Sequence, residues 1–260
     1  MKGLRRFMDW PLRAKLTTLL VAAALLPLIV STAIDIRDAR QRLVMQSAAL
    51  LAARGDQLSG ELDNLNDSYR HAAERIAHIP NALQLSVPAS TDIDPANFES
   101  LHKLLTVMPA SDRNVMALAI LDAHGVVKVA SDSRLVGAPL AYRDFVQKGL
   151  TGVPVTSDIH FAEPQIGSVP AIAFAVPILA DDKRVIGLAV LWLRAAALWD
   201  VMKASNAHAD PASFAVLFDH LGIRIAHTYS QDMAFHPGAP LDKKTIDLLV
   251  AQQRFGPRTR

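Results

Sequence analysis

The chain has 260 residues, which is enough for one large domain or two ordinary ones. It contains no cysteine, which excludes disulfides, thiolate metal sites and cysteine nucleophiles. Its 27 basic and 25 acidic residues nearly balance, and beyond the first 15 positions the basic ones are scattered. Because nucleic acid is bound by a gathered basic stripe, we expect no nucleic-acid partner.

An uncharged apolar segment, LTTLLVAAALLPLIVSTAI, occupies residues 16–34. As a helix it spans roughly 28 Å, close to the hydrocarbon thickness of a bilayer. Residues 1–15 carry 5 basic side chains against 1 acid, whereas the charges after residue 34 are mixed. The positive-inside rule then predicts a cytoplasmic N-terminus and an extracytoplasmic chain after residue 34. A cleaved signal peptide is the alternative, but its apolar region is usually shorter and no Ala-x-Ala cleavage site follows.

A long helix is predicted over residues 35–86, because apolar residues recur there at steps of three, four and seven. The seam residues are Leu51, Leu58, Leu62, Leu65, Tyr69, Ala72, Ile76 and Ile79. Gly55 and Gly60 weaken the helix locally, and Pro80 and Pro88 end it. Two arrangements stay open: the seam packs only on its own domain, or it also pairs with a second copy of the chain.

Two short stretches are near-copies of each other: LDAHGVVKVAS at residues 121–131 and LFDHLGIRIAH at residues 217–227. Each predicts a β-hairpin, in which Asp122 or Asp219 bonds to the turn backbone and Gly125 or Gly222 takes a positive φ. Each hairpin follows a helix-rich stretch and opens a β-rich one. We therefore predict two related α+β units in tandem.

The first unit is predicted in more detail. Residues 86–97 form a loop, and residues 98–108 form an amphipathic helix. After the hairpin we expect a short helix at 143–150 and strands at 155–163, 171–179 and 185–193, the last running into a helix. The five strands form an antiparallel sheet with one face on the long helix and the other holding residues 134–152.

This order of elements resembles the double Cache (dCache) domain, the PAS-like extracytoplasmic sensor of bacterial chemoreceptors, sensor histidine kinases and diguanylate cyclases. The resemblance covers about residues 35–260 and rests on short motifs in a fixed order. They are Asp122 and Gly125; Arg143, Phe145, Gly149 and Gly152; Ala175 and Pro177; and Val185, Ile186 and Gly187. It implies a bacterial inner membrane location, a membrane-distal unit at 98–198 and an incomplete membrane-proximal unit at 213–260. Kinase or cyclase output is expected beyond residue 260.

The resemblance also implies a ligand site between the sheet and residues 134–152. Tyr142, Arg143 and Phe145 match this segment, and Arg143 is suited to a forked pair with a carboxylate. Asp158, His160 and Phe161 on the following strand complete the candidate site. Members that bind amino acids use a downstream Asp for the ammonium group, but Trp192 stands at that position. We therefore expect a small carboxylate, or another small polar ligand, rather than an amino acid.

Each candidate residue also has a purely structural interpretation. Arg143 can lie on the surface or bond loop carbonyls, Tyr142 and Phe145 can belong to the core, and His160 can be a satisfied or exposed histidine. No catalytic motif, metal site or cofactor site is found, so we expect no enzymatic activity in this chain.

The function predicted is thus the small-molecule-sensing input part of a membrane-anchored bacterial receptor, forming a homodimer through the long helix. The alternative is a membrane-anchored periplasmic protein that serves dimerisation or docking without a ligand.

Overall fold

The computed structural model describes residues 11–79, 95–206 and 213–255. The chain divides into two compact units, Met1–Gln57 and Leu58–Arg260. Most of the predicted cytoplasmic segment, residues 1–10, and most of the predicted loop, residues 86–94, lie outside the described residues.

The long helix α2 runs from Leu12 to Ala77 and contains both the apolar segment and the heptad seam. In the described part of the chain it is the one helix long and apolar enough to cross a membrane, judged by length and composition. The helix ends at Ala77, whereas the sequence predicted its end at residue 86. Residues 80–86 lie outside the described part of the chain.

The sheet is built from six strands that pair only in antiparallel fashion. They are β1 (Val115–Asp122), β2 (Val127–Ala130), β3 (Val155–Thr156), β4 (His160–Phe161), β5 (Pro170–Leu179) and β6 (Val185–Arg194). The order across the sheet is β2-β1-β6-β5-β3, and β4 also pairs with β5. The predicted antiparallel α+β architecture is confirmed, with one difference in the third strand.

The strand predicted at 155–163 is broken into β3 and β4, which pair with the same strand β5. The break begins at Ser157, whose hydroxyl donates to the carbonyl of Asp158 (2.8 Å) and accepts the N–H of Ala173 (2.8 Å). A side chain thus takes a ladder bond that a backbone carbonyl would otherwise accept. Ser157–Ile159 therefore lie between the two short strands and no longer alternate strictly between the two faces of the sheet.

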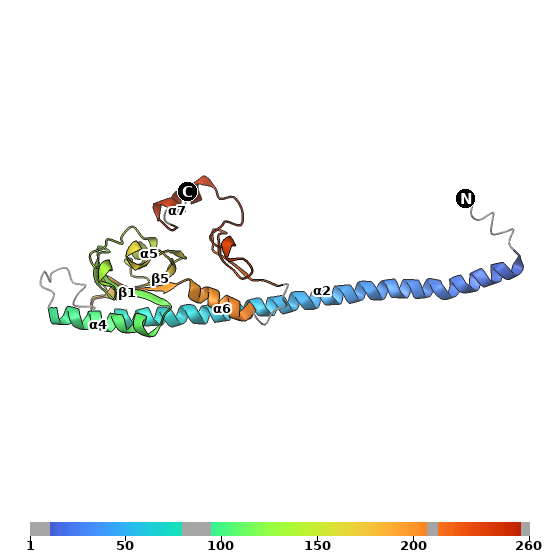
Figure 1. Cartoon of the computed structure of the whole chain (residues 1–260), viewed down its shortest axis with the longest axis horizontal. Coiled ribbons are helices and arrows are strands. Elements are labelled where there is room, and N and C mark those ends of the chain that lie inside the picture. The colour runs from blue at the N-terminus through green and yellow to red at the C-terminus, as the bar shows by residue number, and fades with distance from the viewer. Residues whose placement is uncertain (1–10, 80–94, 207–212, 256–260) are drawn as a thin grey trace. The chain divides into compact units, whose positions relative to one another are not determined.

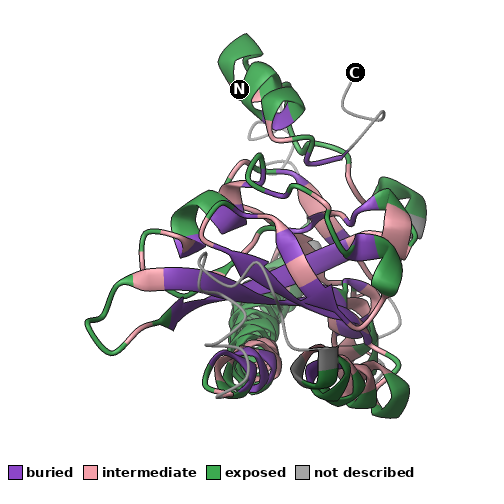
Figure 2. Cartoon of the chain, turned by 90° about the vertical axis from the view of Figure 1, so that its left-hand side faces the viewer, coloured by how far each residue is buried: buried purple, intermediate pink, exposed green. Residues whose placement is uncertain are grey.

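Hydrophobic residues pack against both faces of the sheet, so the strands are buried on both sides (Figure 2). One face packs on the C-terminal turns of α2 and on α4 (Pro95–Ser111), as Figure 1 shows. The other face packs on η1 (Ser133–Leu135) and on α5 (Asp144–Gly149). This confirms the predicted division of the two faces.

The heptad seam of α2 changes its surroundings along its length. Tyr69, Ala72 and Ile76 are buried in the core of the sheet, and the Tyr69 hydroxyl donates to Asp112 (2.7 Å). Leu51 is 60% exposed. The C-terminal turns of the seam therefore pack on their own domain, whereas Leu51 at its start is exposed among the described residues.

The second repeat begins after α6 (Ala196–Asn206). It contains β7 (Val216–Phe218), β8 (Arg224–His227), η3 (Gln231–Met233) and α7 (Lys243–Ala251). Its hairpin matches that of the first repeat: Gly125 and Gly222 have φ values of 75° and 74°. Asp122 and Asp219 each accept two turn N–H groups, as the sequence predicts.

Substitution by alanine is expected to change the stability of the fold in opposite directions at Gly149 in α5 and at Gly60 in α2. A Cβ at Gly149 would lie 2.7 Å from a methyl carbon of the buried Leu188, so Gly149→Ala should destabilise the fold by about 1–3 kcal/mol. A Cβ at Gly60 would meet nothing within 4 Å, so Gly60→Ala should stabilise the helix by about 0.5–1 kcal/mol. Thermal unfolding of the two full-length variants measures the difference, and an unchanged melting temperature for Gly149→Ala would contradict this packing.

Candidate functional site

A pocket with about 340 Å³ of free space, part of it open to solvent, lies where three segments meet. The start of α5, the broken strand and the turn after α7 supply its walls. The lining residues are Arg143, Asp144, Phe145, Ser157, Asp158, His160, Gln252 and Arg254. Charged and polar side chains make up much of its lining, so the pocket is more polar than most small-molecule sites.

Arg143 is buried, with 5% of its surface exposed, and three hydrogen bonds hold its guanidinium in place. Its Nε donates to the Glu163 carboxylate (2.9 Å), Nη2 to the Phe161 carbonyl (3.0 Å) and Nη1 to the Gln253 carbonyl (3.3 Å). The guanidinium therefore ties α5 to β4, to the segment after β4 and to the turn after α7. All three of its nitrogen atoms already have a partner within the chain.

Glu163 is the buried counter-ion of Arg143 and is 1% exposed. Burial raises the pKa of its carboxyl group, and the charge of Arg143 opposes that rise. Its second oxygen, Oε2, and the indole Nε1 of Trp192 are also buried, and the Trp192 side chain interacts with the carboxyl group in the sense that lowers its pKa. Sequence reasoning missed Glu163, since an acidic residue ahead of a Pro-Gln-Ile-Gly turn gives no sign of burial.

His160 is 5% exposed and packs its ring against Phe145, with the ring centres 5.2 Å apart. Its Nδ1 lies 3.1 Å from the Asp158 carbonyl oxygen and 3.2 Å from the Ser157 hydroxyl. Burial and the nearby charges of Arg143 and Arg254 lower the pKa of His160 to about 3. The imidazole is therefore neutral near pH 7.

Arg254 comes from the second repeat and is 4% exposed. Its Nε donates to the Ile159 carbonyl (2.9 Å), and its Nη2 donates to the Asp219 carboxylate (2.6 Å). The backbone carbonyl of Arg254 accepts the N–H of Phe161 (2.7 Å). The second repeat thus docks beside the pocket, and Asp219 holds Arg254 in addition to shaping its own hairpin. No local motif in the sequence marks residue 254 for this position.

The structure brings four of the six candidate residues together. Arg143, Phe145, Asp158 and His160 line the pocket. Tyr142 is 38% exposed, and the Cζ atom of Arg143 lies over its ring, 5.1 Å from the ring centre. Phe161 points elsewhere: its ring packs with Phe235 and Phe255 of the second repeat, at 5.8 Å and 6.4 Å between ring centres.

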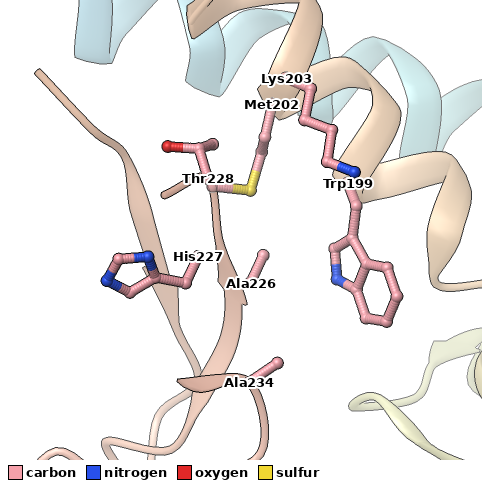
Figure 3. Close-up of a pocket in the computed structure, with 7 residues that line it drawn as sticks. All are labelled: Trp199, Met202, Lys203, Ala226, His227, Thr228 and Ala234. Carbon is pink, nitrogen blue, oxygen red and sulfur yellow. The ribbon is translucent and has the colours of Figure 1, made fainter. Parts of the chain in front are cut away.

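A second pocket of about 310 Å³ of free space lies between α6 and β8 (Figure 3). Its lining residues are Trp199, Met202, Lys203, Ala226, His227, Thr228 and Ala234. Thr228 already bonds to Ala215, and His227 Nδ1 already accepts the N–H groups of residues 229 and 230. This pocket also gathers fewer charged side chains than the first, which is lined by two arginines and two aspartates.

No protein-family model and no curated protein matches the sequence. Solved structures do match. The V. cholerae histidine kinase DctB sensor domain has a TM-score of 0.66 and 14% identity, over 78% of this chain and 75% of that one. The ligand-binding domain of the Campylobacter jejuni chemoreceptor Tlp3, solved with 4-methylisoleucine, has a TM-score of 0.52 and 16% identity, over 71% of this chain and 68% of that one.

The ligand-binding domain of the Pseudomonas aeruginosa PAO1 amino acid chemoreceptor PctC, solved with GABA, has a TM-score of 0.52 and 15% identity, over 74% of this chain and 83% of that one. At such identities the likeness concerns the fold. The chain therefore has the α+β fold of the extracytoplasmic sensor domains of histidine kinases and chemoreceptors, consistent with the double Cache fold that its sequence predicts.

Proposed function

We propose that the chain is the extracytoplasmic, small-molecule-sensing part of a membrane-anchored bacterial signal-transduction receptor. The observation that carries the proposal is the pocket at the start of α5, which gathers Arg143, Asp158 and His160 in the segment where the sequence predicts a ligand site. Buried charged and polar groups that converge on a pocket are typical of specific small-molecule sites.

The apolar part of α2 is proposed to anchor the receptor, with its N-terminus in the cytoplasm and the sheet outside the membrane. This is supported by the uncharged residues 16–34 and by the basic residues before them. The exposed seam residues, such as Leu51, support a homodimer formed through the long helix.

The ligand class that we propose is a small carboxylate. The support is chemical: two guanidinium groups, Arg143 and Arg254, stand at the pocket wall, and guanidinium groups bind carboxylates in charge-assisted pairs. Each already has a carboxylate partner of the chain, Glu163 or Asp219. The ligand therefore has to find a free guanidinium edge or displace an existing partner.

Transmission of the signal is proposed to follow the contacts around the pocket. The strands behind it pack on the C-terminal turns of α2, and Arg143 also bonds the turn after α7. A ligand shifts the equilibrium between two conformations only if it binds one of them more tightly. Each tenfold difference in affinity shifts that equilibrium by about 1.4 kcal/mol.

The test uses the full chain in detergent with a panel of small carboxylates, amines and amino acids. A ligand at one hundred times its dissociation constant should add about 2.7 kcal/mol of stability, seen as a saturable rise in melting temperature. Arg254→Gln should weaken this rise, whereas Lys203→Ala in the second pocket should leave it unchanged. A panel in which no compound raises the melting temperature would contradict a sensing function.

A dimerisation or docking protein without ligand is the second candidate, favoured by the many apolar side chains exposed along α2 after residue 34. They are Ile36, Leu43, Val44, Met45, Leu50 and Leu51. Sedimentation of the same samples separates the two functions. Stable association that no compound in the panel alters, together with no ligand binding, would favour this candidate.

A further inference from the structure

The protonation of His160 decides what its free nitrogen atom can bind. Nδ1 lies beside the Asp158 carbonyl, which can only accept a hydrogen bond, and beside the Ser157 hydroxyl. That hydroxyl already donates its proton to the Asp158 carbonyl. The proton of the neutral ring therefore belongs on Nδ1, and Nε2 is a hydrogen-bond acceptor.

Nε2 of His160 is buried and has no hydrogen-bond partner among the described residues. A buried polar atom without a partner costs free energy, so native proteins rarely leave one unsatisfied. His160 is one of the residues that line the pocket. An occupant that brings a donor to Nε2 removes this cost.

Arg254 offers the free guanidinium edge of the pocket. Its Nε and Nη2 are bonded to Ile159 and Asp219, but among the described residues Nη1 has only an ion contact of 3.7 Å with Asp158. The Asp158 side chain is 47% exposed and also lies 3.4 Å from Nδ1 of His220. It can therefore turn towards solvent at little cost when another anion takes its place.

We infer that the pocket takes a small carboxylate that also carries a hydroxyl group. The hydroxyl donates to Nε2 of His160, and the carboxylate contacts Nη1 of Arg254, so the second repeat supplies part of the ligand site. A hydroxyl donor fits this position better than an ammonium group, because Arg143 and Arg254 both lie close enough to affect His160 electrostatically and would repel a second cation. The inference rests on the proposed function and adds a ligand class and a ligand-binding residue to it.

The test compares matched pairs of acids on the full chain: glycolate with acetate, lactate with propionate, and 3-hydroxybutyrate with butyrate. Titration calorimetry should give about tenfold tighter binding for the hydroxyl-bearing member of at least one pair, the typical effect of one hydrogen bond to a buried group. His160→Phe should reduce this ratio to about one while the affinity for the unsubstituted acid is kept.

Arg254→Gln should weaken both members of the pair by the same factor, because the carboxylate is common to them. Since Arg254 also holds the second repeat, a variant that fails to fold is replaced by Asp158→Asn, which removes the competing anion and should tighten both members. Lys203→Ala is the matched control and should alter neither affinity nor ratio.

The outcomes separate this inference from the proposed function. Equal affinity within every pair, or a hydroxyl preference that survives His160→Phe, overturns the inference and leaves a carboxylate sensor standing. Binding only of compounds without a carboxylate overturns the inference and the ligand class, but not the sensing function. No binding of any compound overturns both.

Discussion

Arg143→Met is expected to lower the free energy of unfolding by about 3–5 kcal/mol, because it leaves the Glu163 carboxylate buried without its cation. The substitution also removes the hydrogen bonds to the Phe161 and Gln253 carbonyls, so β4 and the turn after α7 each lose a contact with residue 143. Thermal or urea unfolding of the full chain measures the effect. We also expect faster amide hydrogen exchange in the turn after α7.

Two further variants show whether the effect comes from the buried charge. The double variant Arg143→Met with Glu163→Leu should recover much of the lost stability, because no unpaired charge remains. Arg134→Met is the control: it removes a surface ion pair, that with Asp132, but the Arg134 side chain is 69% exposed, so little change is expected. Arg143→Met with an unchanged melting temperature would contradict the buried ion pair.

Acidification is expected to destabilise the fold through His160. The pKa of this group is lowered from 6.5 to about 3 in the folded chain, so the unfolded chain binds the proton more readily. The stability that its neutral form provides is complete above pH 6.5 and is lost as the pH falls towards 3. Between pH 6.5 and pH 5 the loss should be about 2 kcal/mol.

Unfolding free energies measured at pH 7, 6 and 5 test this dependence. His160→Gln should remove most of the slope, because glutamine does not titrate in this range. His71→Gln serves as the control, since the His71 side chain is 57% exposed on α2, and it should keep the slope. A wild-type stability that is flat from pH 7 to pH 5 would mean that His160 is not buried as a neutral group.

The broken strand at β3 and β4 connects these expectations. Its residues divide their side chains among three environments: Ile159 in the core on the α2 face, His160 against Phe145 near the pocket, and Phe161 against the rings of the second repeat. The ligand proposed at His160 would contact β4, a strand of two residues. The other residue of this strand, Phe161, packs on the second repeat. This arrangement gives ligand binding a short physical route to the second repeat.

The amino-acid sequence by itself determined the order and type of the elements. The heptad spacing of α2, the change to strand-like alternation at Val115 and the Asp-x-x-Gly turns are local patterns, and each is produced by forces acting between near neighbours in the chain. The candidate segment around Arg143 and Phe145 came from the resemblance to the double Cache family, and its residues stay together because they are neighbours in the chain.

Only the tertiary structure decided which distant residues meet at the pocket. The burial of Glu163 beside Arg143, the docking of Arg254 and the rotation of Phe161 away from the site depend on contacts between segments that are 18 to 110 residues apart. No local pattern encodes such contacts, because the same Glu or Arg is equally compatible with a solvated surface. The break after Thr156 was missed for a related reason: it arises from a single serine hydroxyl competing for a hydrogen bond of the neighbouring strand.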